Sequence, residues 1–262
     1  MRLLEYVEEK RGIDIPKKEA MKLLSSKHSK AYKVHTIDYP IFRGVRGYGE
    51  YVYIDPSKSV EPRISRNTNN YYTLMIDNFS NWNKYPKRSK SIICTTDYQY
   101  ASHMSSKVYR VFPENGSYIG VCPMDDIWGA IAYSPNNEWT YKDVGWSIHE
   151  IAKLPPIKAD DPVDYSDMID IFKKIERYRD KLDIYINDLY TYSNVTKDLW
   201  KEYRSSKKTF LYYMRQIIDP DLSGFKLVKT GNELKKFREV WISAPCVLVN
   251  VSVEGLSLSN LE

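Results

Sequence analysis

The sequence of 262 residues has little cysteine and no long hydrophobic run. Its three cysteines, Cys94, Cys122 and Cys246, are an odd number and form no CxxC pair, so neither a disulfide framework nor a zinc site is supported. Three buried free thiols in a reducing cytoplasm are the expected state. Since no run of about 18 apolar residues occurs, a membrane span is not expected.

Histidine and the common nucleotide-binding motifs are also scarce. The four histidines show no HExxH or comparable spacing, which argues against a catalytic metal bound by histidine. The sequence contains no GxGxxG after a strand, no GxxxxGK[ST], no GxSxG and no EF-hand loop. The glycines of "RGVRGYGE" at 43–50 have the spacing of β-turns rather than that of a phosphate-binding loop.

The composition is that of a globular protein with a mild positive charge. Apolar residues make up 42% and charged residues 28%, so wholesale disorder is excluded. A net charge of +5 is compatible with a nucleic-acid or phosphate-bearing partner. Most of the 23 tyrosines are expected at the edge of the core, and a minority can stack on bases or on a nicotinamide ring.

The first half of the chain predicts a helical N-terminus followed by strands. Residues 1–30 are expected to form a helical lobe that Pro16 divides, and acidic residues within its apolar pattern make it a poor signal peptide. Short apolar runs between Gly, Pro and Asn residues predict the strands. The predicted strands are 32–37, 39–45, 50–55, 91–96, 107–113 and 117–123; a helix is predicted at 70–82 and a turn or helix at 97–106.

The second half predicts a helical hairpin between strands. Three prolines, at 155, 156 and 162, mark a linker. Apolar residues spaced by three and four then predict a long amphipathic helix, capped near Asp164 or Ser166, and a partner helix at 196–218. The hairpin is expected to be an insertion over about 158–220. A strand at 225–230 and an interior strand within "KKFREVWISAPCVLV" at 235–249 close the pattern, with Glu239 at the entrance of the latter.

Four short segments follow one another in a recognisable order. They are "FRG" at 42–44, "CTTDYQYA" at 94–101, "VYRVFPENGSYIGV" at 108–121 and "REVWI" at 238–242. In this order they resemble the mono-ADP-ribosyltransferase superfamily, in its arginine–serine–glutamate branch. Members carry an arginine on an early strand, a Ser-Thr-Ser strand end before a helix, a strand–Gly–strand unit and a glutamate on a last strand. The resemblance spans about 32–123 and 225–252.

The resemblance implies an α+β fold with a split β-sheet core like that of ADP-ribosyltransferases, forming a single domain over 1–262 with N-terminal helices and the inserted hairpin. It implies an NAD-dependent enzyme that transfers ADP-ribose to a macromolecule and releases nicotinamide. Small cytoplasmic enzymes of this kind resemble phage-encoded or toxin–antitoxin effectors. The expected partners are NAD, an acceptor that is RNA, DNA or protein, and an antitoxin or inhibitor protein.

The resemblance also assigns roles to individual residues. Glu239 is expected to stabilise the positive charge that develops on the ribose when the nicotinamide–ribose bond breaks. Arg43 is expected to pair with a phosphate or ribose oxygen, and Thr95 completes the catalytic set. The NAD contacts implied are Arg43, Gly44, Cys94, Thr95 and Thr96. A basic loop set is expected to hold a pyrophosphate or a nucleic-acid backbone; it comprises Arg63, Arg66, Lys87 and Arg88.

Two departures from the family pattern leave alternatives open. Cys94 stands where the first serine is expected, so Thr95 or Ser91 can fill that position instead. Phe237 stands two residues before the glutamate, where arginine-modifying members carry Glu, so modification of a protein arginine is not expected. The Phe237 ring can instead stack on a base.

Three other interpretations fit the same residues. Glu239 can be a solvated residue flanking a strand. The chain can be a non-enzymatic protein that binds nucleic acid or protein through the helical hairpin. A nuclease that binds a divalent metal through Asp125 and Asp126 is the third, although an acidic pair is more typical of a turn or a helix cap.

Overall fold

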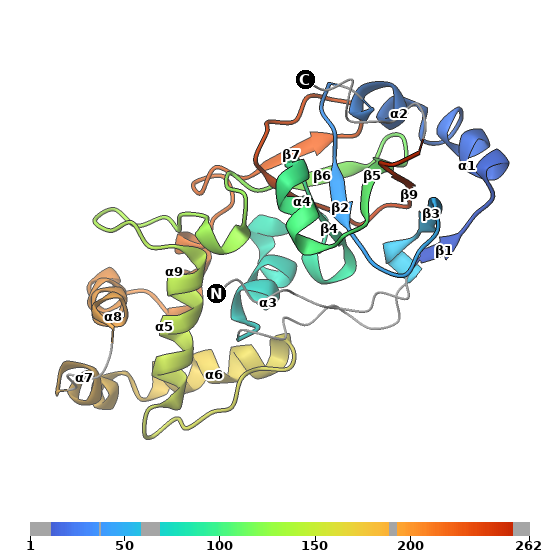
Figure 1. Cartoon of the computed structure of the whole chain (residues 1–262). Coiled ribbons are helices and arrows are strands. Elements are labelled where there is room, and N and C mark those ends of the chain that lie inside the picture. Colours follow the sequence, from blue (N-terminus) through green and yellow to red (C-terminus); the bar gives the residue numbers. More distant parts are fainter. Residues whose placement is uncertain (1–11, 37, 59–68, 189–192, 254–262) are drawn as a thin grey trace. The chain divides into compact units, whose positions relative to one another are not determined.

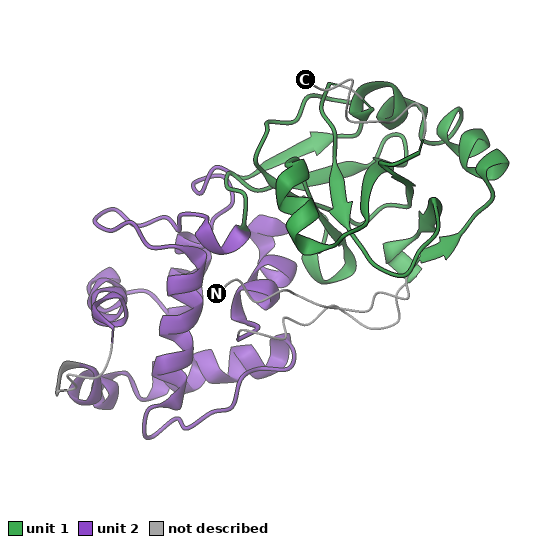
Figure 2. Cartoon of the chain, viewed as in Figure 1, with its two compact units in different colours: residues 1–63, 84–126, 225–262 green, residues 64–83, 127–224 purple. Residues whose placement is uncertain are grey.

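The computed structural model describes residues 12–36, 38–58, 69–188 and 193–253. The chain divides into two compact units, shown in different colours in Figure 2. The sheet unit comprises residues 1–63, 84–126 and 225–262, and the helical unit comprises 64–83 and 127–224. Over the described residues the protein is α+β, with nine α-helices and a nine-stranded antiparallel open sheet (Figure 1).

All nine strands belong to the sheet unit, in the order β1-β3-β9-β5-β2-β4-β8-β6-β7. Because neighbours in this order are mostly distant in sequence, long-range pairing builds the sheet. The strands are β1 (Gly12–Asp14), β2 (Phe42–Gly44), β3 (Tyr51–Ile54), β4 (Ile92–Thr95), β5 (Val108–Pro113), β6 (Tyr118–Val121), β7 (Lys226–Lys229), β8 (Glu239–Ile242) and β9 (Cys246–Asn250).

The two faces of the sheet are buried in different ways. One face, here called the inner face, carries Val52, Cys94, Tyr109, Val240 and Leu248 in a cluster drawn from strands and connecting loops, without any helical residue. The opposite, outer face is covered by helices. The helices α1 (Lys17–Leu24) and α2 (Ser29–His35) pack on β3, β5 and β9, and α4 (Tyr98–Met104) packs on β2.

The predicted interior strand within 235–249 is wrong as a single element. The structure has two strands there, β8 and β9, which three other strands separate in the sheet. Pro245 lies in the short connection between them, and proline has no N–H to donate to a ladder. The chain therefore leaves one part of the sheet after Ile242 and enters another at Cys246.

The N-terminal prediction is confirmed in part. Helices α1 and α2 follow Pro16, but Gly12–Asp14 form β1, and residues 1–11 lie outside the described residues. The strand predicted at 32–37 is wrong because 29–35 is α2. Its buried residues, Ala31 and His35, are four apart and so share one helical face.

Several short elements of the sheet unit are confirmed. The strands predicted at 91–96, 107–113 and 117–123 appear as β4, β5 and β6, and the predicted turn or helix at 97–106 is α4. Asp97 caps α4, because its side chain accepts a hydrogen bond from the Gln99 N–H. These elements follow from local signals, namely apolar runs and a cap.

The helical unit has more helices than the predicted hairpin. The stretch expected to form two long helices forms four: α6 (Tyr165–Arg177), α7 (Arg179–Asp188), α8 (Asn194–Ser206) and α9 (Phe210–Ile217). The predicted cap of the first is confirmed, since the Asp164 side chain accepts a hydrogen bond from the Asp167 N–H. Lys207, with φ of 56°, ends α8 in the left-handed conformation.

The same unit also contains α3 (Tyr71–Asn78) and α5 (Tyr141–Lys153). The helix predicted at 70–82 is confirmed as α3, followed by a 3-10 turn at Ser80–Trp82. None of the helices in the described parts of the chain is both long and apolar enough to span a membrane.

Candidate active site

The register of the sheet brings two of the predicted site residues side by side. Strands β2, β4 and β8 are neighbours, and antiparallel pairing places Phe42 opposite Thr95 and Thr95 opposite Glu239. Residues opposite each other in such a pair project from the same face of the sheet. Phe42, Thr95 and Glu239 therefore form one row on the outer face.

Arg43 lies on the adjacent strand but on the other face. Side chains alternate along a strand, so Arg43 projects from the inner face if Phe42 projects from the outer one. Its surroundings agree, because the Arg43 charge acts on Cys246, which belongs to the inner-face cluster, and Arg43 Nη1 also donates to the Ile93 carbonyl. Burial raises the pKa of the Cys246 thiol, and the nearby Arg43 charge opposes that rise. The structure thus brings Thr95 and Glu239 together and places the Arg43 side chain across the sheet from them.

Glu239 is a buried residue, and the interpretation of it as a solvated flank is wrong. It is the first residue of β8 and is 7% exposed. Its backbone N–H donates to the Met124 carbonyl, and its own carbonyl accepts from the Cys122 N–H, both at 2.9 Å. These two backbone hydrogen bonds fix the main chain at Glu239 independently of the contacts of its side chain.

The Glu239 carboxylate pairs with a buried arginine. Arg88 Nη1 lies 2.6 Å from Glu239 Oε1, and the two side chains are 5% and 10% exposed. Arg88 begins a single 3-10 turn, Arg88–Lys90, directly before β4. A charge-assisted bond in such a dry place is strong and holds the carboxylate in one orientation.

A thiol lies close to this ion pair. Burial raises the pKa of Cys122, and the negative charge of Glu239 raises it further. The Cys122 Sγ also accepts a hydrogen bond from the Met124 N–H at 3.4 Å. A buried thiol that stays protonated is a poor nucleophile, so Cys122 contributes packing at the site.

Thr95, the last residue of β4, and Thr96, directly after it, form hydrogen bonds with the neighbouring main chain. Thr95 Oγ1 accepts from the Asp97 N–H at 3.0 Å, and Thr96 Oγ1 donates to the Lys235 carbonyl at 2.8 Å. Thr96 Oγ1 also accepts from the Arg238 N–H at 2.9 Å. Because Lys235 and Arg238 belong to the segment that leads into β8, Thr96 fixes that segment against the end of β4.

The other candidates for NAD contacts have different surroundings. Cys94 pairs with Val240 and belongs to the inner-face cluster, so it projects away from Glu239. A Cβ added at Gly44 would lie 2.3 Å from the Ala101 carbonyl oxygen, so this glycine allows α4 to approach β2. Ser91 is buried and donates to the Lys87 carbonyl at 2.7 Å. Arg63 and Arg66 lie outside the described residues.

Phe237 is strained and exposed at the edge of this site. Its φ is 56°, and 58% of the residue is accessible to solvent. A bulky residue in the left-handed region costs about 1–2 kcal/mol. Thr96 hydrogen-bonds to Lys235, two residues before Phe237, and to Arg238, directly after it, and these bonds hold the strained conformation in place.

Arg88 is the residue that sequence reasoning missed as a partner of Glu239. It belongs to the basic run "KYPKRSK" at 84–90, and a run of this kind is typical of a solvated loop. Local sequence gave no sign of the pairing either, since Arg88 and Glu239 are 151 positions apart. The acidic pair Asp125 and Asp126 gains no support as a metal site, because no group of three potential ligands occurs among the described residues.

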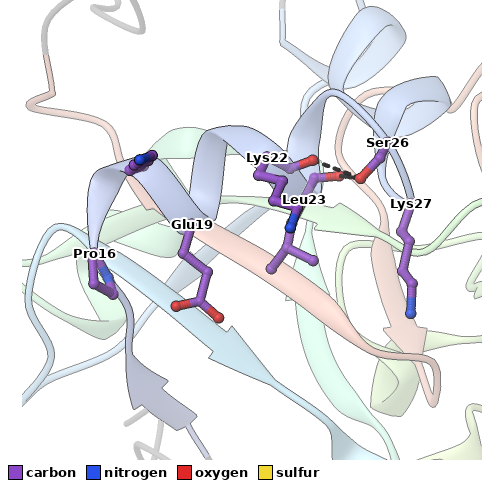
Figure 3. Close-up of a pocket in the computed structure, with 7 residues that line it drawn as sticks. Pro16, Glu19, Lys22, Leu23, Ser26 and Lys27 are labelled. Atoms are coloured by element: carbon purple, nitrogen blue, oxygen red, sulfur yellow. Dashed lines mark hydrogen bonds between the residues drawn. The ribbon is translucent and has the colours of Figure 1, made fainter.

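A hollow on the surface of the sheet unit lies apart from the Glu239 row. It follows α1 and the turn after it (Figure 3). Three lysines, Lys18, Lys22 and Lys27, line it together with Glu19 and the hydroxyl of Ser26, which donates to the Lys22 carbonyl at 2.6 Å. These are flexible surface side chains, and they make no preformed site.

Comparison with protein-family models, with curated proteins and with solved structures finds no match for this chain. The chemistry of the Glu239 site is therefore the ground on which a function can be inferred.

Proposed function

We propose that this protein is an NAD-dependent ADP-ribosyltransferase with Glu239 as its catalytic carboxylate. The observation that carries the proposal is the row on the outer face, where Glu239 lies opposite Thr95 and is held by Arg88 at 2.6 Å. Two segments of the family-like series, "CTT" and "REVWI", thereby meet on neighbouring strands. A carboxylate held in one orientation can stabilise the oxocarbenium-like transition state through which a glycosidic bond is cleaved.

The proposed reaction is a substitution at the ribose carbon that carries nicotinamide. The bond from this carbon to the ring nitrogen breaks, and its electron pair leaves with neutral nicotinamide. A nucleophilic oxygen or nitrogen of the acceptor forms the new bond and loses its proton. The ribose carries positive charge in between, and a charged carboxylate in a water-poor site stabilises that charge.

In this proposal Arg88 is a positioning residue. Its guanidinium keeps the Glu239 carboxylate charged and oriented before NAD binds. Thr95 is the hydroxyl in the same row, and Phe237 offers an exposed ring to the acceptor. Arg43 has no role at the ribose here because its side chain projects from the inner face.

The first test is nicotinamide release by the Glu239→Gln variant. We expect the rate to fall by about 10²-fold or more, because the amide carries no charge to stabilise the ribose cation. Glu233→Gln is the matched control, since Glu233 is an exposed glutamate in the segment that leads to β8. The substitution also removes a charge partner of the buried Arg88, so the rates are measured well below the melting temperature of the variant. Nicotinamide release near the wild-type rate would contradict the assignment of Glu239 as the catalytic carboxylate.

The second test separates the enzyme from a non-enzymatic binding protein. NAD should raise the melting temperature of the wild-type chain, because a ligand that binds the folded state stabilises it. Labelled NAD mixed with a cell lysate, followed by separation of protein from nucleic acid, then identifies the acceptor. If NAD does not raise the melting temperature and neither fraction takes up label, the proposed enzyme is ruled out and the non-enzymatic binding protein is favoured.

A further inference from the structure

The sheet unit buries a second arginine, Arg110, which has no counter-charge within the described part of the chain. Arg110 lies within β5 and is 2% exposed. Its Nε atom is sealed from solvent and has no hydrogen-bond partner, and no ion pair of its guanidinium is found among the described residues. Burial alone lowers the pKa of Arg110, with no contribution from a neighbouring charge.

The sheet register fixes the position of this side chain. Arg110 lies opposite Phe42 on β2 and opposite Val249 on β9, so it projects from the outer face. Phe42 belongs to the apolar cluster beneath α4, and Val249 belongs to the cluster beneath α1 and α2. The guanidinium therefore lies between two apolar clusters. We call this position the Arg110 slot.

An unpaired cation in such a place is costly. Moving an isolated charge out of water costs several kcal/mol even after relaxation, and arginine does not escape the cost by losing its proton. A strand residue between two paired neighbours also cannot turn its side chain to the other face. The slot is therefore a preformed cationic site whose charge the described part of the chain leaves uncompensated.

We propose that the Arg110 slot binds a phosphate group. The guanidinium presents parallel N–H donors, and a phosphate edge presents two oxygens at matching separation, so a bidentate pair supplies charge and hydrogen bonds together. The apolar walls strengthen the pairing by excluding water. The phosphate is either free inorganic phosphate or the phosphate of a nucleotide.

This site is distinct from the Glu239 site. Phe42 separates Arg110 from Thr95 along the row, and α4 packs over Phe42. A ligand in the slot therefore does not extend along the sheet surface to Glu239. The proposal does not depend on the proposed transferase activity, and Glu239→Gln should keep the phosphate response described next.

Thermal unfolding with and without phosphate tests the proposal, with chloride keeping the ionic strength constant. Inorganic phosphate should raise the melting temperature of the wild-type chain by about 5 °C at roughly a hundredfold excess over Kd. Arg110→Met should abolish the rise, whereas Arg46→Met, which removes an exposed arginine of the same unit, should keep it. Adenosine monophosphate in a parallel series shows whether a nucleotide phosphate enters the slot, by a larger rise than inorganic phosphate gives.

Stability in chloride provides the second readout. Arg110→Met should be as stable as the wild type or more stable, since it replaces an unpaired buried cation by an apolar chain of similar length. Arg110→Lys keeps the charge without the fork and should keep only part of the phosphate response, which covers the case that the methionine variant does not fold. An equal phosphate response in Arg110→Met, or no response in the wild type, overturns the proposal.

Discussion

The sheet unit contains two buried arginines in opposite situations. Arg88 and Arg110 are 4% and 2% exposed, so burial is nearly the same. Arg88 has the Glu239 carboxylate at 2.6 Å, while Arg110 has neither an ion pair nor a partner for Nε in the described structure. The comparison shows that burial of an arginine does not reveal its role. The counter-charge decides whether it is part of the fold or available to a ligand.

The difference arises from the elements that carry the two side chains. Arg88 begins a short 3-10 turn, and such a turn can adjust until the guanidinium meets a carboxylate. Arg110 lies inside β5, where hydrogen bonds to β2 and β9 fix the backbone and the pleat fixes the side-chain direction. The described strands therefore hold Arg110 in place without bringing a carboxylate to it.

The largest expected effect is on stability, and it separates the two arginines directly. Arg88→Met should lower the free energy of unfolding by about 3–5 kcal/mol, because it removes the guanidinium that lies 2.6 Å from the buried Glu239 carboxylate. Arg110→Met in chloride should change it little or raise it. Urea denaturation of both variants measures the two values. Equal losses would show that Arg110 has a counter-charge within the protein.

A double substitution sharpens the assignment of the Arg88 effect. Replacing both partners in Arg88→Met/Glu239→Leu removes both buried charges, so most of the lost stability should return. The double-mutant cycle is measured by urea denaturation. If the loss of unfolding free energy in the double variant equals the sum of the losses in the two single variants, the pair contributes through packing rather than charge.

Acid is expected to weaken the part of the sheet unit around β5. His28 Nδ1 lies 2.8 Å from the Phe112 carbonyl, and burial lowers the pKa of both His28 and His35. Above about pH 6.5 both histidines are neutral in the folded and in the unfolded chain. Below that pH the unfolded chain binds protons more readily than the folded one, so the free energy of unfolding falls as the pH falls. Each histidine contributes a slope of at most about 1.4 kcal/mol per pH unit.

Variants assign this pH dependence. His28→Gln should reduce the loss of unfolding free energy between neutral and mildly acidic pH, while His103→Gln, at an exposed position, should leave it unchanged. Urea denaturation across the pH range measures both. An unchanged slope in His28→Gln contradicts the prediction.

The smallest expected effect concerns the segment beside the Arg88–Glu239 pair. Phe237→Gly should be more stable than Phe237→Ala by about 1 kcal/mol, because glycine adopts a φ of 56° without strain. Both variants remove the exposed ring, so their difference reports the backbone alone. Thermal unfolding of the two variants measures it, and equal melting temperatures would show that Phe237 is not held in the left-handed conformation in solution.

Local signals in the sequence predicted much of the secondary structure. Strands β4, β5 and β6, helix α3 and the cap Asp164 follow from apolar runs and capping chemistry within a few residues. The errors have local causes as well. The segment 32–37 has strand-like composition but buries a helical face, and the amphipathic period at 164–218 continues across the breaks at Tyr178 and Lys207.

The candidate site was predictable to a smaller extent. The order of the motifs suggested that Thr95 and Glu239 meet, and they lie opposite each other on neighbouring strands. The face on which Arg43 projects depends on register, and a shift of one residue reverses it. The partner of Glu239 lies 151 positions away in a basic run, where no pattern distinguishes a buried arginine from a solvated one.

The sequence by itself determined the α+β class, most of the short elements and the absence of a CxxC or HExxH motif, because these depend on composition and on neighbours along the chain. Only the tertiary structure decided that Glu239 is buried, that Arg88 rather than Arg43 pairs with it, and that Arg110 has no counter-charge among the described residues. These outcomes depend on strand order and register, which long-range pairing sets and which no local stretch of sequence encodes.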